Sequence, residues 1–146
     1  MQKVLHTELA LFAEELLVRL AKAKSTHAAT LVTLSGDLGA GKTTLVQALA
    51  LALGVKESVS SPTYVIMKSY TIAWGGFTKL VHIDLYRLEK PEELAALNLE
   101  MVFSDPGNLV CIEWPERAGD LLPHPNLALH LSSAGASESE RFVEIF

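Results

Sequence analysis

The spacing of apolar residues in the first third of the chain predicts a helix, a strand and a second helix. Apolar side chains recur at intervals of three and four from about residue 7 to 24, with charged residues between them, which is typical of an amphipathic covering helix. Residues 30–34 are apolar and β-branched, as in a strand. Residues 44–53 have the pattern of a buried helix that ends at Gly54.

The remaining apolar runs predict strands and one short helix. The strands fall at residues 64–70, 79–84, 109–112, 127–131 and 141–146, and the helix at 91–97. Trp74-Gly75-Gly76-Phe77 predicts a hairpin turn whose aromatic side chains either pack across the strands or form a partner contact. Because hairpins occur among crossover connections, the sheet is expected to be mixed, in an α/β sandwich. At 146 residues, the chain is expected to form a single domain, 1–146.

The segment between the first strand and the second helix carries the clearest chemical motif. Residues 36–43 read G-D-L-G-A-G-K-T, a complete Walker A loop, which predicts the phosphates of a nucleoside triphosphate held on Mg²⁺ in a P-loop NTPase-like three-layer fold. Lys42 supplies a cation for the phosphates, and Thr43 supplies a hydroxyl for Mg²⁺. The predicted nucleotide contacts in this loop are Gly36, Asp37, Leu38, Gly39, Ala40, Gly41, Lys42, Thr43 and Thr44. A plain glycine turn is the alternative, but it gives Lys42 no purpose.

Acidic residues at two predicted strand ends are candidates for catalysis, because ligands of open α/β sheets lie outside the carboxyl ends of the strands. Glu113 follows the apolar run 109–112 at the position of a Walker B acid, where it contacts Mg²⁺ or its water; a solvated strand end is the alternative. Asp84 either orients a water molecule or caps the turn after its strand. We therefore predict catalytic roles for Lys42, Asp84 and Glu113.

Thr63 and Trp114 each have a functional and a structural interpretation, and His82 has a structural one. Thr63 is either a switch threonine that meets Mg²⁺ or part of an ordinary turn. The predicted metal residues are accordingly Thr43, Thr63 and Glu113. Trp114 either covers the nucleotide or packs in the core. His82 alternates with its neighbours and is expected to face packing or solvent.

Composition limits the choice of partners and compartment. The net charge is −5, and no basic cluster exceeds Lys22-Ala23-Lys24, so the chain is not expected to bind nucleic acid unaided. The single cysteine, Cys111, lies in an apolar run and suits a reducing cytoplasm. No apolar stretch approaches the roughly 18 residues that span a bilayer. We expect a cytoplasmic protein without a membrane segment, as a monomer or weak homo-oligomer.

Four motifs together resemble the TsaE family over nearly the whole chain. They are G-D-L-G-A-G-K-T at 36–43, S-P-T-Y at 61–64, H-I-D-L-Y-R-L at 82–88 and I-E-W-P-E-R at 112–117. The resemblance implies the ATPase subunit of the bacterial machinery that installs threonylcarbamoyl on the adenosine next to the tRNA anticodon. It implies ATP as the nucleotide, TsaB and TsaD as partners, tRNA met only through their complex, and ATP hydrolysis that resets the complex between turnovers. Because the chain shows no convincing arginine finger and no recognisable acceptor pocket of its own, we expect this hydrolysis to be weak alone and stimulated by the partners.

Two other nucleotide-dependent functions are the alternatives. A small-molecule P-loop kinase usually closes an arginine-bearing lid, whereas the arginines here are scattered at Arg19, Arg87, Arg117 and Arg141. A GTP-dependent switch needs an N/T-K-x-D base reader, and Thr78-Lys79 is followed by Leu-Val instead. ATP, GTP and candidate phosphate acceptors would separate these functions in one assay.

Overall fold

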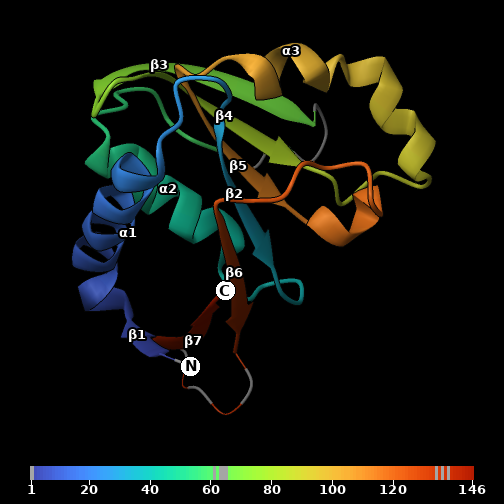
Figure 1. The fold of residues 1–146 in the computed structure, drawn as a ribbon. Coiled ribbons are helices and arrows are strands. Elements are labelled where there is room, and N and C mark those ends of the chain that lie inside the picture. The colour runs from blue at the N-terminus through green and yellow to red at the C-terminus, as the bar shows by residue number, and fades with distance from the viewer. Residues whose placement is uncertain (1, 61, 63–65, 134, 136, 138) are drawn as a thin grey trace.

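The chain forms an α/β structure around one seven-stranded sheet (Figure 1). This computed structural model describes residues 2–60, 62, 66–133, 135, 137 and 139–146. The strands are β1 (Gln2–Leu5), β2 (Thr30–Ser35), β3 (Met67–Trp74), β4 (Phe77–Asp84), β5 (Asn108–Glu113), β6 (Leu127–Ser132) and β7 (Glu140–Ile145). Their order across the sheet is β1-β7-β6-β2-β5-β4-β3, which confirms the predicted α/β fold with a mixed sheet.

The centre of the sheet is parallel and its two sides are antiparallel. Strands β6, β2, β5 and β4 run parallel, so the carboxyl ends of β2, β4 and β5 meet at one edge of the sheet. The β3–β4 hairpin closes one side, and β7 and β1 add antiparallel strands at the other. The strands predicted at residues 127–131 and 141–146 are present as β6 and β7, and they pair antiparallel.

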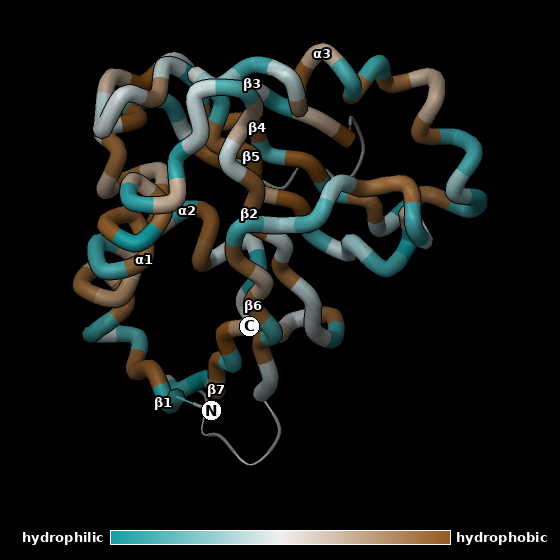
Figure 2. Tube along the Cα trace, in the orientation of Figure 1, coloured by the Kyte–Doolittle hydropathy of each residue, from teal (hydrophilic) through white to brown (hydrophobic). Residues whose placement is uncertain are grey.

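Helices cover both faces of the sheet and make it the middle of three layers. Helices α1 (Leu9–Ala23) and α2 (Lys42–Ala52) lie on one face, as Figure 1 shows. On the other face lie the 3-10 helix η2 (Pro91–Leu97), α3 (Leu99–Ser104) and the 3-10 helix η3 (Pro115–Ala118). A hydrophobic core lies on each side of the sheet. The central strands are rich in apolar residues, which appear in brown in Figure 2. This composition is expected for strands that are covered on both faces.

The hairpin tip packs against the body of the protein. Trp74 and Phe77 are paired across the turn, Phe77 is buried, and the Lys24 ammonium lies 5.6 Å from the centre of its ring. This arrangement favours the packing interpretation of the two aromatic residues over a partner contact. Within the described part of the chain, no helix is long and apolar enough to cross a membrane.

Candidate functional site

The loop between β2 and α2 has a shape that glycine makes possible. Gly36 has a φ of 137°, and a Cβ atom there would lie 2.2 Å from the carbonyl oxygen of Leu131 on β6. Gly41 has a φ of 100° and precedes Lys42, the first residue of α2. No side chain caps this helix start, so the backbone N–H groups of its first turn remain available to an anion.

Lys42 folds back onto its own loop. Its Nζ donates hydrogen bonds to the carbonyl oxygens of Gly36 at 2.6 Å and Asp37 at 2.8 Å, and it lies 4.2 Å from the centre of the Trp114 ring. Burial lowers the pKa of the Lys42 amine from its ordinary value, while nearby carboxylates, Glu113 first, oppose that shift. The lysine is therefore a buried cation that can exchange loop carbonyls for phosphate oxygens.

Glu113 joins the loop to the sheet. The Thr43 hydroxyl donates a shared hydrogen bond to both carboxylate oxygens of Glu113, each at 2.9 Å. The Nε2 atom of His82 lies 2.5 Å from Oε2 of Glu113. Glu113 is 2% exposed, so it is a buried, hydrogen-bonded carboxylate and not a solvated strand end. His82 is fully buried, as the packing prediction allowed, but its contact with Glu113 was not predicted.

Asp84 lies beside Glu113 on the neighbouring parallel strand. The two residues are in register at the carboxyl ends of β4 and β5. One carboxylate oxygen of Asp84 accepts a hydrogen bond of 3.0 Å from the backbone N–H of Tyr86, which is the turn-capping contact that the sequence left open. Asp84 also lines the pocket described below, so the capping contact leaves a role toward a ligand available.

Trp114 forms a cover over Lys42. It has φ 59° and ψ 50°, a left-handed conformation that turns the chain directly after β5. Its ring lies 5.0 Å from the ring of Tyr86, and the Arg117 guanidinium lies 5.8 Å from the Trp114 ring. Trp114 is half-buried and lines the pocket, so it is a site residue as well as a packing residue.

A pocket of about 360 Å³ opens against the loop. One side consists of loop and strand-end residues, which are Leu38, Gly39, Gly41, Lys42, Thr43, Thr44, Asp84, Glu113 and Trp114. The other side is mostly apolar and comes from the N-terminal segment and β7; it includes Val4, Leu5, His6, Leu9, Phe12, Arg141 and Val143. Sequence reasoning missed this second side, because no motif marks residues 4–12 or Arg141.

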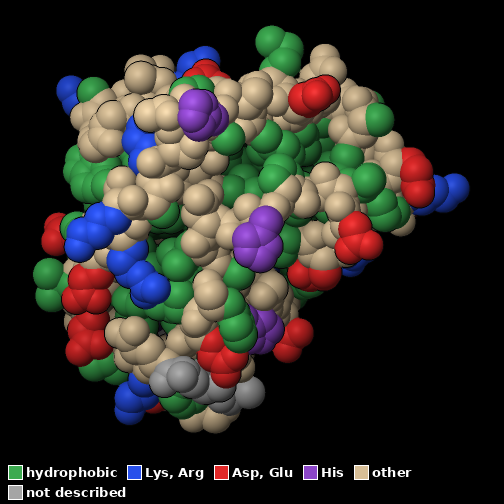
Figure 3. Space-filling view, in the orientation of Figure 1, with side chains coloured by type: hydrophobic (Ala, Val, Ile, Leu, Met, Phe, Trp, Pro, Cys, Tyr) green, Lys and Arg blue, Asp and Glu red, His purple; other side chains and the backbone are tan. Residues whose placement is uncertain are grey.

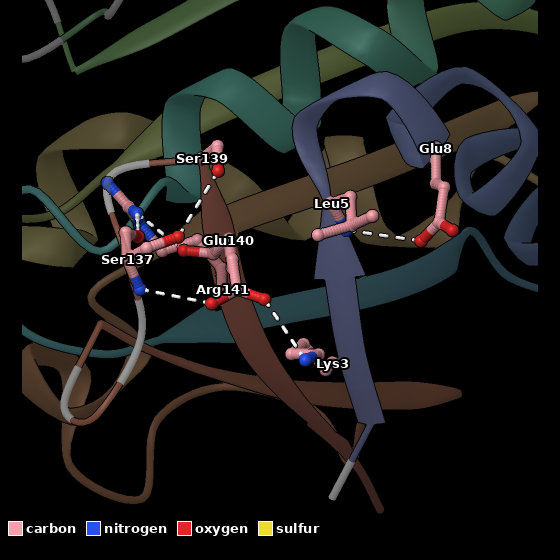
Figure 4. A network of polar contacts seen from close by, with 7 residues as sticks. All are labelled: Lys3, Leu5, Glu8, Ser137, Ser139, Glu140 and Arg141. Carbon is pink, nitrogen blue, oxygen red and sulfur yellow. Dashed lines mark hydrogen bonds and ion pairs between the residues drawn. The ribbon is translucent and has the colours of Figure 1, made fainter.

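Polar contacts join the N-terminal segment to the β6–β7 hairpin next to the pocket (Figure 4). Lys3 pairs with Glu140 at 3.1 Å, and the backbone N–H of His6 donates to the Ser139 carbonyl at 2.8 Å. The Ser137 backbone N–H and the Lys3 ammonium hold the pKa of Glu140 below its usual range. Arg141 donates to the Glu140 carbonyl at 2.6 Å, so this junction also orients a cation that lines the pocket.

The structure brings most of the predicted site residues together. Beyond the pocket lining, Gly36 and Asp37 contact Lys42 through their carbonyls, and Ala40 is a buried residue of the loop. Thr63 lies outside the described residues, so its predicted metal contact stays a prediction.

The site offers too few protein ligands to hold a metal ion by itself in the described residues, but its oxygen atoms suit Mg²⁺ that is also bound by phosphates and water. Across the described ranges, no group of three or more His, Cys, Asp or Glu side chains is arranged to hold a metal ion. Thr43 and Glu113 offer oxygen atoms, which Mg²⁺ prefers, and Mg²⁺ commonly takes its remaining ligands from substrate phosphates and water. The site therefore fits Mg²⁺ that arrives with a phosphorylated ligand.

Comparison with known proteins gives consistent matches. A sequence model described as threonylcarbamoyl adenosine biosynthesis protein TsaE matches residues 7–142. Proteins named tRNA threonylcarbamoyladenosine biosynthesis protein TsaE are 42% identical in Nostoc (81% of this chain, 70% of theirs), 38% in Haemophilus influenzae (73%, 65%) and 40% in Bacillus subtilis (75%, 65%). The crystal structure of Bacillus subtilis YdiB superposes with a TM-score of 0.67 and 29% identity, covering 97% of this chain and 80% of that one.

Proposed function

The chain belongs to the TsaE family of threonylcarbamoyl adenosine biosynthesis proteins, and we propose that it binds ATP with Mg²⁺ and hydrolyses the ATP to ADP and phosphate. The observation that carries this proposal is the contact between the loop and the sheet. Thr43, in the phosphate loop, donates a hydrogen bond from its hydroxyl to the carboxylate of Glu113 at the end of β5. That bond leaves an oxygen lone pair of Thr43 for Mg²⁺ and sets a carboxylate next to the metal's water shell.

The loop and the strand-end residues then have distinct roles toward the nucleotide. The backbone of residues 36–44 and the start of α2 bind the phosphates, and Lys42 releases its two loop carbonyls to contact the β- and γ-phosphates. Bound Mg²⁺ supplies charge neutralisation on the phosphate oxygens. Glu113 and Asp84 orient the attacking water, and Trp114 excludes bulk solvent from Lys42. Thr63, which lies outside the described residues, would complete the metal contacts in the triphosphate state.

The mostly apolar side of the pocket suits the nucleoside. Leu9 and Phe12 give it apolar surface, while His6 and Arg141 give it polar groups. Most ligand pockets combine a largely apolar lining with a few polar groups that orient the ligand. A nucleotide would thus have its phosphates at the loop and its base and ribose toward β1 and β7.

The nucleotide cycle serves tRNA modification through protein partners. TsaB and TsaD are the proposed partners, with tRNA met only through their complex in the cytoplasm. The net charge of −5 supports this, because a protein that binds RNA directly usually carries a basic surface. On the face seen in Figure 3, Lys and Arg side chains are interspersed with Asp and Glu. Partner stimulation also fits a phosphate site with few cations of its own.

The proposal is tested by nucleotide binding and turnover in three proteins. Wild type is expected to bind ATP with Mg²⁺ and to turn over slowly, and a stoichiometric TsaB–TsaD complex is expected to raise the rate. Lys42→Ala is expected to lose ATP binding without unfolding, because the change removes a loop cation and no core side chain. Glu113→Ala is expected to keep ATP binding and lose hydrolysis by about a hundredfold or more.

Retained turnover in Lys42→Ala, with unchanged Mg²⁺ dependence, would contradict the phosphate-loop assignment. A high rate in the isolated chain that the partners leave unchanged would contradict the coupled ATPase and favour a self-sufficient kinase or hydrolase. Equal or better turnover of GTP in the same assay would favour the nucleotide switch.

A further inference from the structure

His82 is a fully buried polar side chain in an otherwise apolar layer. It lies on β4, pairs in register with Cys111 of β5, and points to the same face of the sheet as the core residue Leu80. Burial of an imidazole without a hydrogen bond is costly, whereas an apolar residue at this position would simply extend the core. Its one hydrogen bond among the described residues is to Glu113, which makes that contact the feature to explain.

Glu113 is held from two sides. Thr43 donates to both carboxylate oxygens from the loop, and His82 contacts Oε2 from within the sheet. Asp84, in register on the neighbouring strand, places a second carboxylate alongside. A glutamate side chain has three rotatable bonds, and repulsion from Asp84 favours rotamers that move the Glu113 carboxylate away. A contact with a metal-bound water needs a fixed carboxylate, so we expect a second donor besides the Thr43 hydroxyl to be required.

The second ring nitrogen of His82 indicates which atom carries the proton. Nδ1 of His82 is buried and has no hydrogen-bond partner within the described part of the chain. A buried N–H without a partner is rarer than a buried acceptor without one, so the ring proton belongs on Nε2. His82 then donates to Glu113, and the bond is directional.

We propose that His82 is the positioning residue of the Mg²⁺ site: its Nε2–H fixes the Glu113 carboxylate against Thr43, so that Glu113 is preset for the metal-bound water. The inference rests on the proposed function and adds a residue to it. His82 touches neither nucleotide nor metal and acts only through Glu113. Groups that orient the direct metal contacts typically contribute 10- to 100-fold to metal affinity or activity.

Two substitutions of nearly equal length separate a donor from mere packing. His82→Gln keeps an amide N–H at the reach of Nε2, and His82→Met fills similar space without a donor. We expect His82→Gln to stay within about threefold of wild type in kcat and in the Mg²⁺ concentration for half-maximal rate. We expect His82→Met to lower kcat at least tenfold and to raise that Mg²⁺ concentration about tenfold. ATP binding without Mg²⁺ should change less than about twofold in both.

Two measurements test whether His82 acts through its hydrogen bond to Glu113 or only by stabilising the fold. In a Glu113→Gln background, His82→Met should add less than about a twofold loss, because its route to the metal is already removed. Nitrogen NMR of the nucleotide-free protein should show the His82 proton on Nε2. This second readout needs no activity and no metal.

Several results would overturn the inference. These are an Nε2 atom without a proton, equal kinetics in the Gln and Met variants, a tenfold loss in a folded His82→Gln, or a loss from His82→Met that is as large in the Glu113→Gln background as in wild type. If His82→Met does not fold, the Gln variant and the NMR result still decide. A wild type without Mg²⁺-dependent ATP turnover overturns the proposed function and this inference together. A normal wild type with a normal His82→Met overturns this inference alone.

Discussion

At the scale of single residues, the phosphate loop passes so close to β6 that only glycine fits at position 36. Gly36 passes against β6 so tightly that a Cβ atom would overlap the Leu131 carbonyl oxygen. Gly54, just after α2, also has a positive φ, of 85°, but a Cβ atom there would have no neighbour within 4 Å. A side chain at Gly54 thus meets only backbone strain, whereas a side chain at Gly36 meets both backbone strain, at a φ of 137°, and a steric overlap.

Gly36→Ala is therefore expected to be more destabilising than Gly54→Ala. The second change carries only the strain of a left-handed residue, about 1–2 kcal/mol. The first adds displacement of the loop from β6 and should weaken ATP binding at least tenfold. Urea unfolding and calorimetry of ATP binding check both effects. Similar losses in the two variants would mean that the loop tolerates the displacement.

Site residues that belong to a local sequence motif could be predicted from the sequence, whereas residues that reach the site only through strand pairing could not. Lys42 and Thr43 follow from one loop motif, and Glu113 from a strand end. The hydrogen bond between His82 and Glu113 depends on the register of β4 against β5, which the sequence pattern does not specify. In the sequence, Arg141 is one of four scattered arginines, and its place at the pocket depends on where the terminal hairpin pairs.

At the scale of elements, β1 and β7 line the pocket together with the loop between β2 and α2. β1 has four residues and was not predicted, since so short an edge strand shows no clear alternation. Helix α3, of six residues, was missed for a similar reason. The longer helices were predicted, to within about two residues at their ends, because several turns of 3.6-residue spacing repeat in them. The β1 edge is joined to β7 by Lys3 and Glu140.

Glu140→Gln is expected to lower Tm slightly at pH 7, as for an exposed ion pair. The folded-state pKa of Glu140 is below its ordinary value of 4.5, so the carboxylate stabilises the fold above that value and loses this effect as pH falls through the folded pKa. The Tm difference between wild type and Glu140→Gln should therefore shrink as the pH is lowered below about 4.5. Thermal melts from pH 7 to pH 2 check this, with Lys3→Gln as the matched variant. A difference that grows in acid would contradict the ion pair.

At the scale of the whole molecule, Cys111 reports on global opening. It lies at the centre of the sheet, and burial, with a smaller contribution from Glu113, raises the pKa of its thiol to about 12. Alkylating reagents react with the thiolate, which is nearly absent at pH 8 until the sheet opens. Its modification rate therefore follows the unfolding equilibrium.

ATP with Mg²⁺ is expected to slow alkylation of Cys111 at pH 8. Ligand at one hundred times its Kd stabilises the folded state by about 2.7 kcal/mol, which corresponds to roughly a hundredfold slower reaction. Mass spectrometry after timed exposure to iodoacetamide measures it. Lys42→Ala is the control and should show no protection. Protection of that variant would place ATP somewhere other than the phosphate loop.

The contacts of Lys42 also bear on the affinity of the whole protein for nucleotide. Two loop carbonyl oxygens and the Trp114 ring surround the Lys42 ammonium, so under the proposed function a phosphate would compete with the protein's own groups for this cation. Nucleotide binding would then be an exchange of hydrogen bonds, and the apparent Kd would equal the intrinsic Kd divided by the fraction of molecules in which Lys42 has left these contacts. A partner that draws Trp114 or the loop carbonyls away from Lys42 would tighten nucleotide binding without touching the nucleotide.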